Sequence, residues 1–146
     1  MKKIALFILT VLTISCTQDK QETGAAEMKG QWKTLEVKVN RTQPIHDVNC
    51  DAEKKGIADL YALNPDGSFT IKDICSGKLR DIQKNTWKFE DHILSLKYVL
   101  GSNETKAVYS VVEMGDKKVK WKLLYTRYNG EYTLEDIGYY LIMEKQ

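Results

Sequence analysis

From Trp32 to the C-terminus the chain alternates between apolar and polar residues, in short segments separated by turns. A period of two indicates strands that bury one face, and no segment shows a convincing helical period. The pattern therefore predicts an all-β protein with eight strands, at residues 32–39, 58–64, 68–74, 82–90, 92–100, 105–114, 118–127 and 136–145.

Short turns join nearly all of these segments. The sequence Pro65-Asp66-Gly67 is a strong hairpin signal, because Gly67 can adopt positive φ, and a tight turn is expected around Asp91. Consecutive short turns produce an antiparallel meander, and eight strands can close into a small barrel without free edges. We therefore expect an eight-stranded antiparallel up-and-down β-barrel over residues 30–146. An open twisted sheet or a β-sandwich is the alternative.

The phase of each strand predicts which side chains face inward. In the first strand Trp32 is out of phase with Leu35 and Val37, which predicts a β-bulge near Lys33 or Thr34. The expected interior comprises the apolar residues of one face of each strand: Leu35, Val37, Tyr61, Leu63, Phe69, Ile71, Trp87, Phe89, Leu94, Leu96, Tyr98, Trp121, Leu123, Tyr125, Tyr139 and Leu141.

A stripe of lysines, Lys118, Lys120 and Lys122, alternates with apolar residues in the seventh strand. Period two places these lysines on the outer face. A solvated surface is one interpretation, and contact with phospholipid headgroups is the other.

The N-terminal segment MKKIALFILTVLTIS has the layout of a secretory signal. Two lysines precede the apolar stretch Ile4–Ile14, which is shorter than the roughly 20 residues of a membrane-spanning helix. Cys16 follows, and then polar chain. This pattern resembles a bacterial lipoprotein signal, although Thr13 stands where leucine is usual. Ordinary cleavage near Gly24–Glu27 is the alternative.

The resemblance to lipoprotein signals implies a location. Residues 1–15 would be removed, Cys16 would carry acyl chains such as palmitate, and residues 16–29 would form a flexible tether of roughly 20 Å. The membrane would then be a partner through this anchor. The protein would lie in the cell envelope, facing the periplasm or exposed on the outer membrane.

Further motifs carry a second resemblance. Gly30-Gln31-Trp32 opens the first strand, a long polar loop follows at residues 40–56, and the later sequence contains "NC…NPDGSF…C…TWKFEDHILSL". In this order the features resemble the lipocalin-like domains of small bacterial lipoproteins, over about residues 28–145. The resemblance implies that Trp32 plugs the closed end of the barrel and that the loop at 40–56 lids the open end. It also implies an arginine packed over the tryptophan, for which Arg127 is the one plausible counterpart.

If Cys16 is lipidated, Cys50 and Cys75 remain as an even pair in an oxidising compartment, which predicts a disulfide. It would attach the lid loop to the end of the third strand. Zinc binding and thiol catalysis are the rival interpretations. They find little support, because the chain has no C-x-x-C motif, and His46 and His92 lie on the lid and at a strand start.

The sequence points away from catalysis and from nucleic acid. Lys and Arg number 22 against 20 Asp and Glu, so the chain has no strong positive field to attract nucleic acid. It contains no G-x-S-x-G, no H-E-x-x-H and no glycine-rich phosphate loop. We therefore expect neither an enzyme nor a bound metal or cofactor.

The resemblance favours a barrel that binds a small hydrophobic or amphipathic ligand. In a meander, odd strands finish and even strands start at the lidded end, which places the expected binding residues there: Val37, Tyr61, Ile71, Leu123, Tyr125 and Tyr139. The alternative is a barrel filled by its own side chains, which acts through its outer surface as a protein-interaction module or an inhibitor. The partner protein in that case is unknown.

Overall fold

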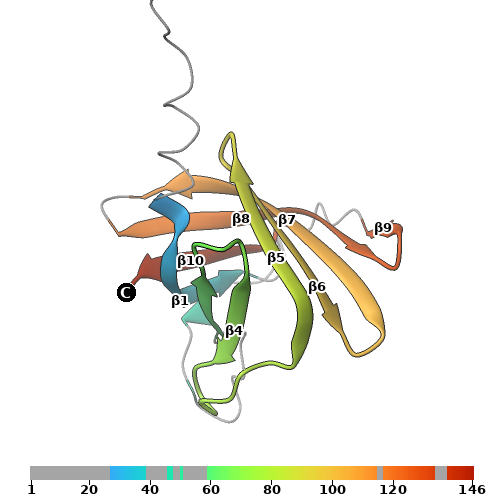
Figure 1. Cartoon of the computed structure of the whole chain (residues 1–146). Coiled ribbons are helices and arrows are strands. Elements are labelled where there is room, and N and C mark those ends of the chain that lie inside the picture. Colours follow the sequence, from blue (N-terminus) through green and yellow to red (C-terminus); the bar gives the residue numbers. More distant parts are fainter. Residues whose placement is uncertain (1–26, 39–45, 48–49, 51–58, 115–116, 134–137) are drawn as a thin grey trace, which may run out of the picture.

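The computed structural model describes residues 27–38, 46–47, 50, 59–114, 117–133 and 138–146 (Figure 1). Eight antiparallel strands form a nearly closed barrel in the order β4-β3-β1-β10-β8-β7-β6-β5. The predicted eight-stranded antiparallel barrel is thus confirmed. The strands of the barrel are β1 (Gly30–Lys38), β3 (Asp59–Leu63), β4 (Phe69–Asp73), β5 (Ile82–Glu90), β6 (Ile93–Leu100), β7 (Asn103–Glu113), β8 (Lys118–Tyr128) and β10 (Tyr140–Lys145). Two short strands lie off this path: β2 (His46–Asp47) pairs with β1, and β9 (Glu131–Thr133) pairs with β8.

The barrel closes between its first and last strands, because β1 pairs with β10 over most of its length. The incomplete seam lies between β4 and β5. There, Ser68 and Thr86 form an isolated bridge, Trp87 N donates to Gly67 O at 2.8 Å, and the Asn85 side chain donates to the Phe69 carbonyl. These contacts hold the two edges together at one end of the seam.

The predicted hairpin turns are confirmed. Gly67 has φ of +81°, and Asn64 N donates to Ser68 O at 2.9 Å across the turn. Asp91 and His92, with φ of +48° and +62°, form the two-residue loop between β5 and β6. Positive φ at both positions matches the right-handed twist of paired strands.

A bulge in β1 is also confirmed, but it lies between Thr34 and Glu36, slightly later than predicted. Trp32, Thr34 and Val37 therefore face inward, exposed by 4%, 0% and 2%. The expectation that Leu35 belongs to the interior is wrong, because the extra residue turns it away and leaves it half-buried.

A second bulge was not predicted. Val108 pairs with Tyr125, whereas Tyr109 pairs with Leu123, so Leu124 is the extra residue in β8. Tyr125 consequently leaves the inward phase. Its ring lies 5.5 Å from that of Tyr132, and the expectation that it faces the interior is wrong.

The rest of the expected interior is confirmed, since those residues are buried in the core or packed against it. The core also contains Met28, which is 3% exposed although it was expected in the tether. The lysine stripe lies on the outer face, because Val119 and Trp121, which alternate with it, are buried. No helix among the described residues is long and apolar enough to cross a membrane.

Trp32 lies under a lysine rather than an arginine. Lys145 Nζ lies 5.4 Å from the Trp32 ring centroid, whereas Arg127 stacks on Tyr132 and donates to Gly130 O at 2.9 Å. The expected role of Arg127 is therefore wrong.

Several predictions concern residues outside the described part of the chain. These are the signal segment at residues 1–15, Cys16, and the tether up to residue 26. Of the lid expected at 40–56, the structure describes His46, Asp47 and Cys50.

Candidate functional site

The clearest candidate site is a cavity of about 270 Å³ at one end of the barrel. It lies where β4, β6 and β8 finish and β3, β5 and β7 begin. The lid was expected at this same end of the barrel. Its lining residues come from seven barrel strands or the segments beside them: Asp59, Tyr61, Ile71, Arg80, Ile82, Tyr98, Leu100, Ala107, Tyr109, Leu123, Thr126, Tyr128 and Tyr139.

The structure brings together four of the six predicted binding residues. Tyr61, Ile71, Leu123 and Tyr139 line this cavity. Val37 is buried in the core but is not among the lining residues, and Tyr125 lies on the outer face.

Tyrosines dominate the wall of the cavity. Five of the eight tyrosines in the sequence line it: Tyr61, Tyr98, Tyr109, Tyr128 and Tyr139. Burial, together with neighbouring tyrosines and Asp59, raises the pKa of the Tyr61 and Tyr109 hydroxyls well above the usual range. These hydroxyls stay protonated at neutral pH and can both donate and accept hydrogen bonds.

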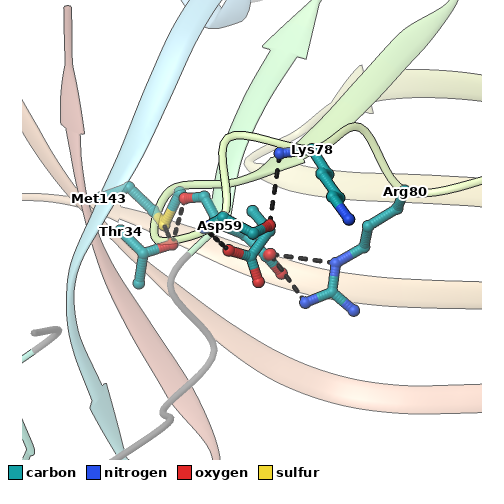
Figure 2. Close-up of polar contacts among 7 residues, drawn as sticks. Thr34, Asp59, Lys78, Arg80 and Met143 are labelled. Atoms are coloured by element: carbon teal, nitrogen blue, oxygen red, sulfur yellow. Dashed lines mark hydrogen bonds and ion pairs between the residues drawn. The ribbon is translucent and has the colours of Figure 1, made fainter. Parts of the chain in front are cut away.

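An ion pair adds charge to this wall. Arg80 donates to Asp59 Oδ1 through Nε at 3.0 Å and through Nη2 at 2.8 Å. The Asp59 side chain is 3% exposed and that of Arg80 is 42% exposed, so the arginine bridges the buried carboxylate and solvent. Figure 2 shows Asp59 between Arg80 and Thr34, whose hydroxyl donates to the Asp59 carbonyl oxygen at 2.9 Å.

Desolvation controls the titration of this carboxyl group. Burial raises the pKa of Asp59, and the nearby Arg80 guanidinium, which acts in the opposite direction, offsets only part of that effect. Arg80 is therefore the group that makes a buried negative charge tolerable at this end of the barrel.

The segment that carries Arg80 is fixed at several points. Arg80 N donates to Ile71 O at 2.8 Å, and Asp73 N donates to Lys78 O at 2.9 Å. Cys75, in the same segment, forms a disulfide with Cys50, with a Cα–Cα distance of 5.2 Å. The predicted disulfide is thus present, and it connects the lid region to the wall of the cavity.

Below the cavity the barrel is filled by its own side chains. Trp121 is fully buried, and its ring centroid lies 5.3 Å from Tyr61, 5.9 Å from Tyr109 and 6.3 Å from Trp32. Its indole Nε1 has no hydrogen-bond partner among the described residues. The cavity is therefore a shallow cup above an aromatic floor, which limits the length of any ligand.

Sequence reasoning missed several residues of the cup. Tyr109 alternates regularly with Ala107 and Val111 in β7, but no residue of that strand was placed in the expected interior. Thr126 lies at an inward position of β8 whose phase the bulge at Leu124 obscured. Asp59 and Arg80 could not be paired, because they are 21 residues apart and Arg80 lies in the segment between β4 and β5 rather than in a strand.

Within the part of the chain that the structure describes, no group of three or more His, Cys, Asp and Glu side chains is placed to hold a metal ion. Comparison with family models, with curated proteins and with solved structures found no match.

Proposed function

We propose that this protein is a lipid-anchored, lipocalin-like binding protein of the bacterial cell envelope, and that its cup binds a small amphipathic molecule. The observation that carries the proposal is the concentration of five tyrosines and an ion pair in one cavity. Small-molecule sites are concave and mostly apolar, with a few polar groups that orient the ligand.

The size and chemistry of the cup narrow the class of ligand. About 270 Å³ is near the lower end of ligand-site volumes, and Trp121 blocks deeper entry. Ile71 and Leu123 supply apolar contact, while protonated tyrosine hydroxyls supply hydrogen bonds. The best fit is a compact ring compound that carries a hydroxyl or carbonyl group.

We propose that the cup binds its ligand and does not act on it chemically. Tyrosine hydroxyls that remain protonated at neutral pH serve as hydrogen-bond partners and not as bases. The Asp59 carboxylate is likewise engaged by two hydrogen bonds from Arg80.

The proposed location rests on the N-terminal sequence and on the disulfide. The order of lysines, apolar stretch and Cys16 resembles a lipoprotein signal, and a disulfide between Cys50 and Cys75 suits an oxidising compartment. Both features support a position in the cell envelope, facing the periplasm or the outside.

The test compares 2-naphthol with naphthalene, which has the same ring system without the hydroxyl. Wild-type protein should bind 2-naphthol more tightly, by about 3- to 10-fold, which corresponds to one net hydrogen bond. Tyr109→Phe should reduce this preference, because Tyr109 lines the cup. Tyr125→Phe removes a hydroxyl from the outer face and is the matched control.

Two results would count against the cup as a binding site. One is failure of the wild-type protein to bind either compound, and the other is an equal response of the two tyrosine variants. Native mass spectrometry of protein purified from its own host is the complementary measurement, since a retained small molecule would identify the ligand directly.

A second candidate function follows from the aromatic floor. Because Trp121, Phe69 and Leu141 are fully buried, much of the barrel is filled by its own side chains. Such a barrel could act through its outer surface as a protein-interaction module or an inhibitor. Absence of ring binding, together with a retained protein partner, would favour this function.

A further inference from the structure

A second and larger cavity lies at the opposite end of the barrel. Its volume is about 420 Å³, within the usual range for ligand sites. Its walls come from the starts of β1 and β8 and the ends of β5, β7 and β10. The lining residues are Glu27, Met28, Trp32, Phe89, His92, Val111, Glu113, Lys117, Lys118, Val119 and Lys145.

The inner part of this cavity is apolar. Trp32, Val111 and Val119 are buried, with exposures of 4%, 6% and 7%, and the Phe89 ring packs against the same core. Met28 is held over the cavity, because Trp32 Nε1 donates to its carbonyl oxygen at 2.7 Å. This interior suits an alkyl or aryl group.

The rim carries an excess of positive charge, since three lysines and two glutamates line the cavity. Lys145 has a structural role, because it donates to Glu27 O at 2.6 Å and lies over the Trp32 ring. Lys117 and Lys118 are exposed, and the ion pairs of the described residues do not include them. These two ammonium groups are available to an anion.

This cavity lies close, along the chain, to the proposed lipid anchor, which would place a source of lipid near it. The described chain begins at Glu27, on the wall of this cavity, and Cys16 lies eleven residues earlier, at most about 40 Å away even in a fully extended chain. Val112 and Met114, near the end of β7, are each 51% exposed. If Cys16 is anchored as proposed above, this end is tethered to a lipid surface.

We infer that this cavity binds an anionic amphiphile. The alkyl chain would enter between Trp32 and Val111, and the anionic group would lie beside Lys117 and Lys118. The ligand could be a free fatty acid or an anionic lipid of the membrane, since both present the same chemistry. The site is separate from the tyrosine cup, and only the membrane source rests on the proposed anchor.

The experiment measures quenching of tryptophan fluorescence by 12-bromododecanoate, because bromine quenches an indole only at close range. Wild-type protein should show saturable quenching, and most of it should disappear in Trp32→Phe. Val111→Phe fills the cavity and leaves Trp32 in place, so it should abolish the quenching without removing the reporter.

The lysines are tested by Lys117→Gln/Lys118→Gln, which should weaken binding by roughly 5- to 10-fold, as expected for two exposed charge contacts. Lys97→Gln/Lys122→Gln removes two exposed lysines away from this cavity and should leave binding unchanged. A brominated alkyl-trimethylammonium ion should bind far more weakly than the carboxylate.

Vesicles with brominated acyl chains distinguish the sources. Quenching by phosphatidylglycerol vesicles identifies membrane lipid as the ligand, and quenching by the free acid alone identifies a free amphiphile. Absence of saturable quenching in both overturns the proposal. Equal binding of the cation, or no effect of the Lys117/Lys118 variant, overturns the assignment to anions. Tyr109→Phe should leave all of these results unchanged, so failure at the cup and failure here can be distinguished.

Discussion

Removal of the Arg80 guanidinium should destabilise the barrel in a manner that depends on pH. The Arg80→Gln variant leaves the Asp59 carboxylate, which is only 3% exposed, without its cationic partner. Breaking a fully buried ion pair costs about 3–5 kcal/mol, whereas exposed pairs contribute about 0–1 kcal/mol. Because Arg80 is 42% exposed and solvent screens it, we expect a loss of about 2 kcal/mol near pH 7.5. For a domain of this size, that loss lowers the melting temperature by roughly 8 °C.

The sign of the pH dependence follows from the pKa of Asp59. Burial raises this pKa in the folded state above its unfolded value, which is about 3.9, and removal of Arg80 raises it further. Between the unfolded and the folded pKa, the folded state binds more protons than the unfolded state. The contribution of Asp59 to stability therefore increases as the pH falls, and it is lost as the pH rises through the folded pKa. The deficit of Arg80→Gln relative to wild type should therefore shrink between pH 7.5 and pH 5.

Urea unfolding at several pH values, followed by circular dichroism, measures this difference. Asp59→Asn/Arg80→Gln removes both charges, and at pH 7.5 it should be more stable than Arg80→Gln alone. If Arg80→Gln loses the same free energy at pH 5 and pH 7.5, or if the double variant is the less stable, the buried charge is not the cause of the loss and the reasoning is refuted.

Three other perturbations have definite expected outcomes. Reduction of the Cys50–Cys75 disulfide should cost about 3 to 4 kcal/mol, because it frees a loop with a sequence separation of 25, and a melting curve with and without reductant measures it. Trp121→Ala should cost about 3–5 kcal/mol in urea unfolding, since the side chain is fully buried; a loss below about 1 kcal/mol would show that the aromatic floor is loosely packed. Cys16→Ser should move the protein from the membrane fraction to the soluble fraction, and unchanged fractionation would argue against the anchor.

The strand pattern and turns were predictable from the sequence because each depends on local chemistry. Alternation of apolar residues gives the buried face of a strand, and Gly67 permits the positive φ that its turn requires. The β8–β9 hairpin was missed although its signal was present. Asn129-Gly130, with φ of +46° and +93°, is the favoured two-residue turn between paired strands.

The failed predictions of inward residues share one physical cause. A β-bulge adds one residue to a strand, so every later side chain exchanges the inner for the outer face. In β1 this excluded Leu35, and in β8 it excluded Tyr125. In the sequence, the out-of-phase Trp32 indicates the bulge in β1. The bulge in β8 has no comparable signal.

The bulge in β8 also determines the chemistry of the cup. With an uninterrupted alternation from Leu123, Tyr125 and Arg127 would face the interior. The extra residue at Leu124 instead turns Thr126 and Tyr128 toward the cavity and places Arg127 outside, where it stacks on Tyr132. Thr126 and Tyr128 thereby line the cavity in place of Tyr125 and Arg127, so the cup keeps one arginine, Arg80, which Asp59 already neutralises. The proposed preference for a neutral, hydroxyl-bearing ring depends on the inward phase of Thr126 and Tyr128. Deletion of Leu124 removes the extra residue but leaves Thr126 and Tyr128 in the inward phase, so the preference for 2-naphthol over anionic ring compounds such as 2-naphthoate should be retained, provided that circular dichroism shows the barrel intact. A switch of preference to 2-naphthoate in a folded deletion variant would contradict this reasoning.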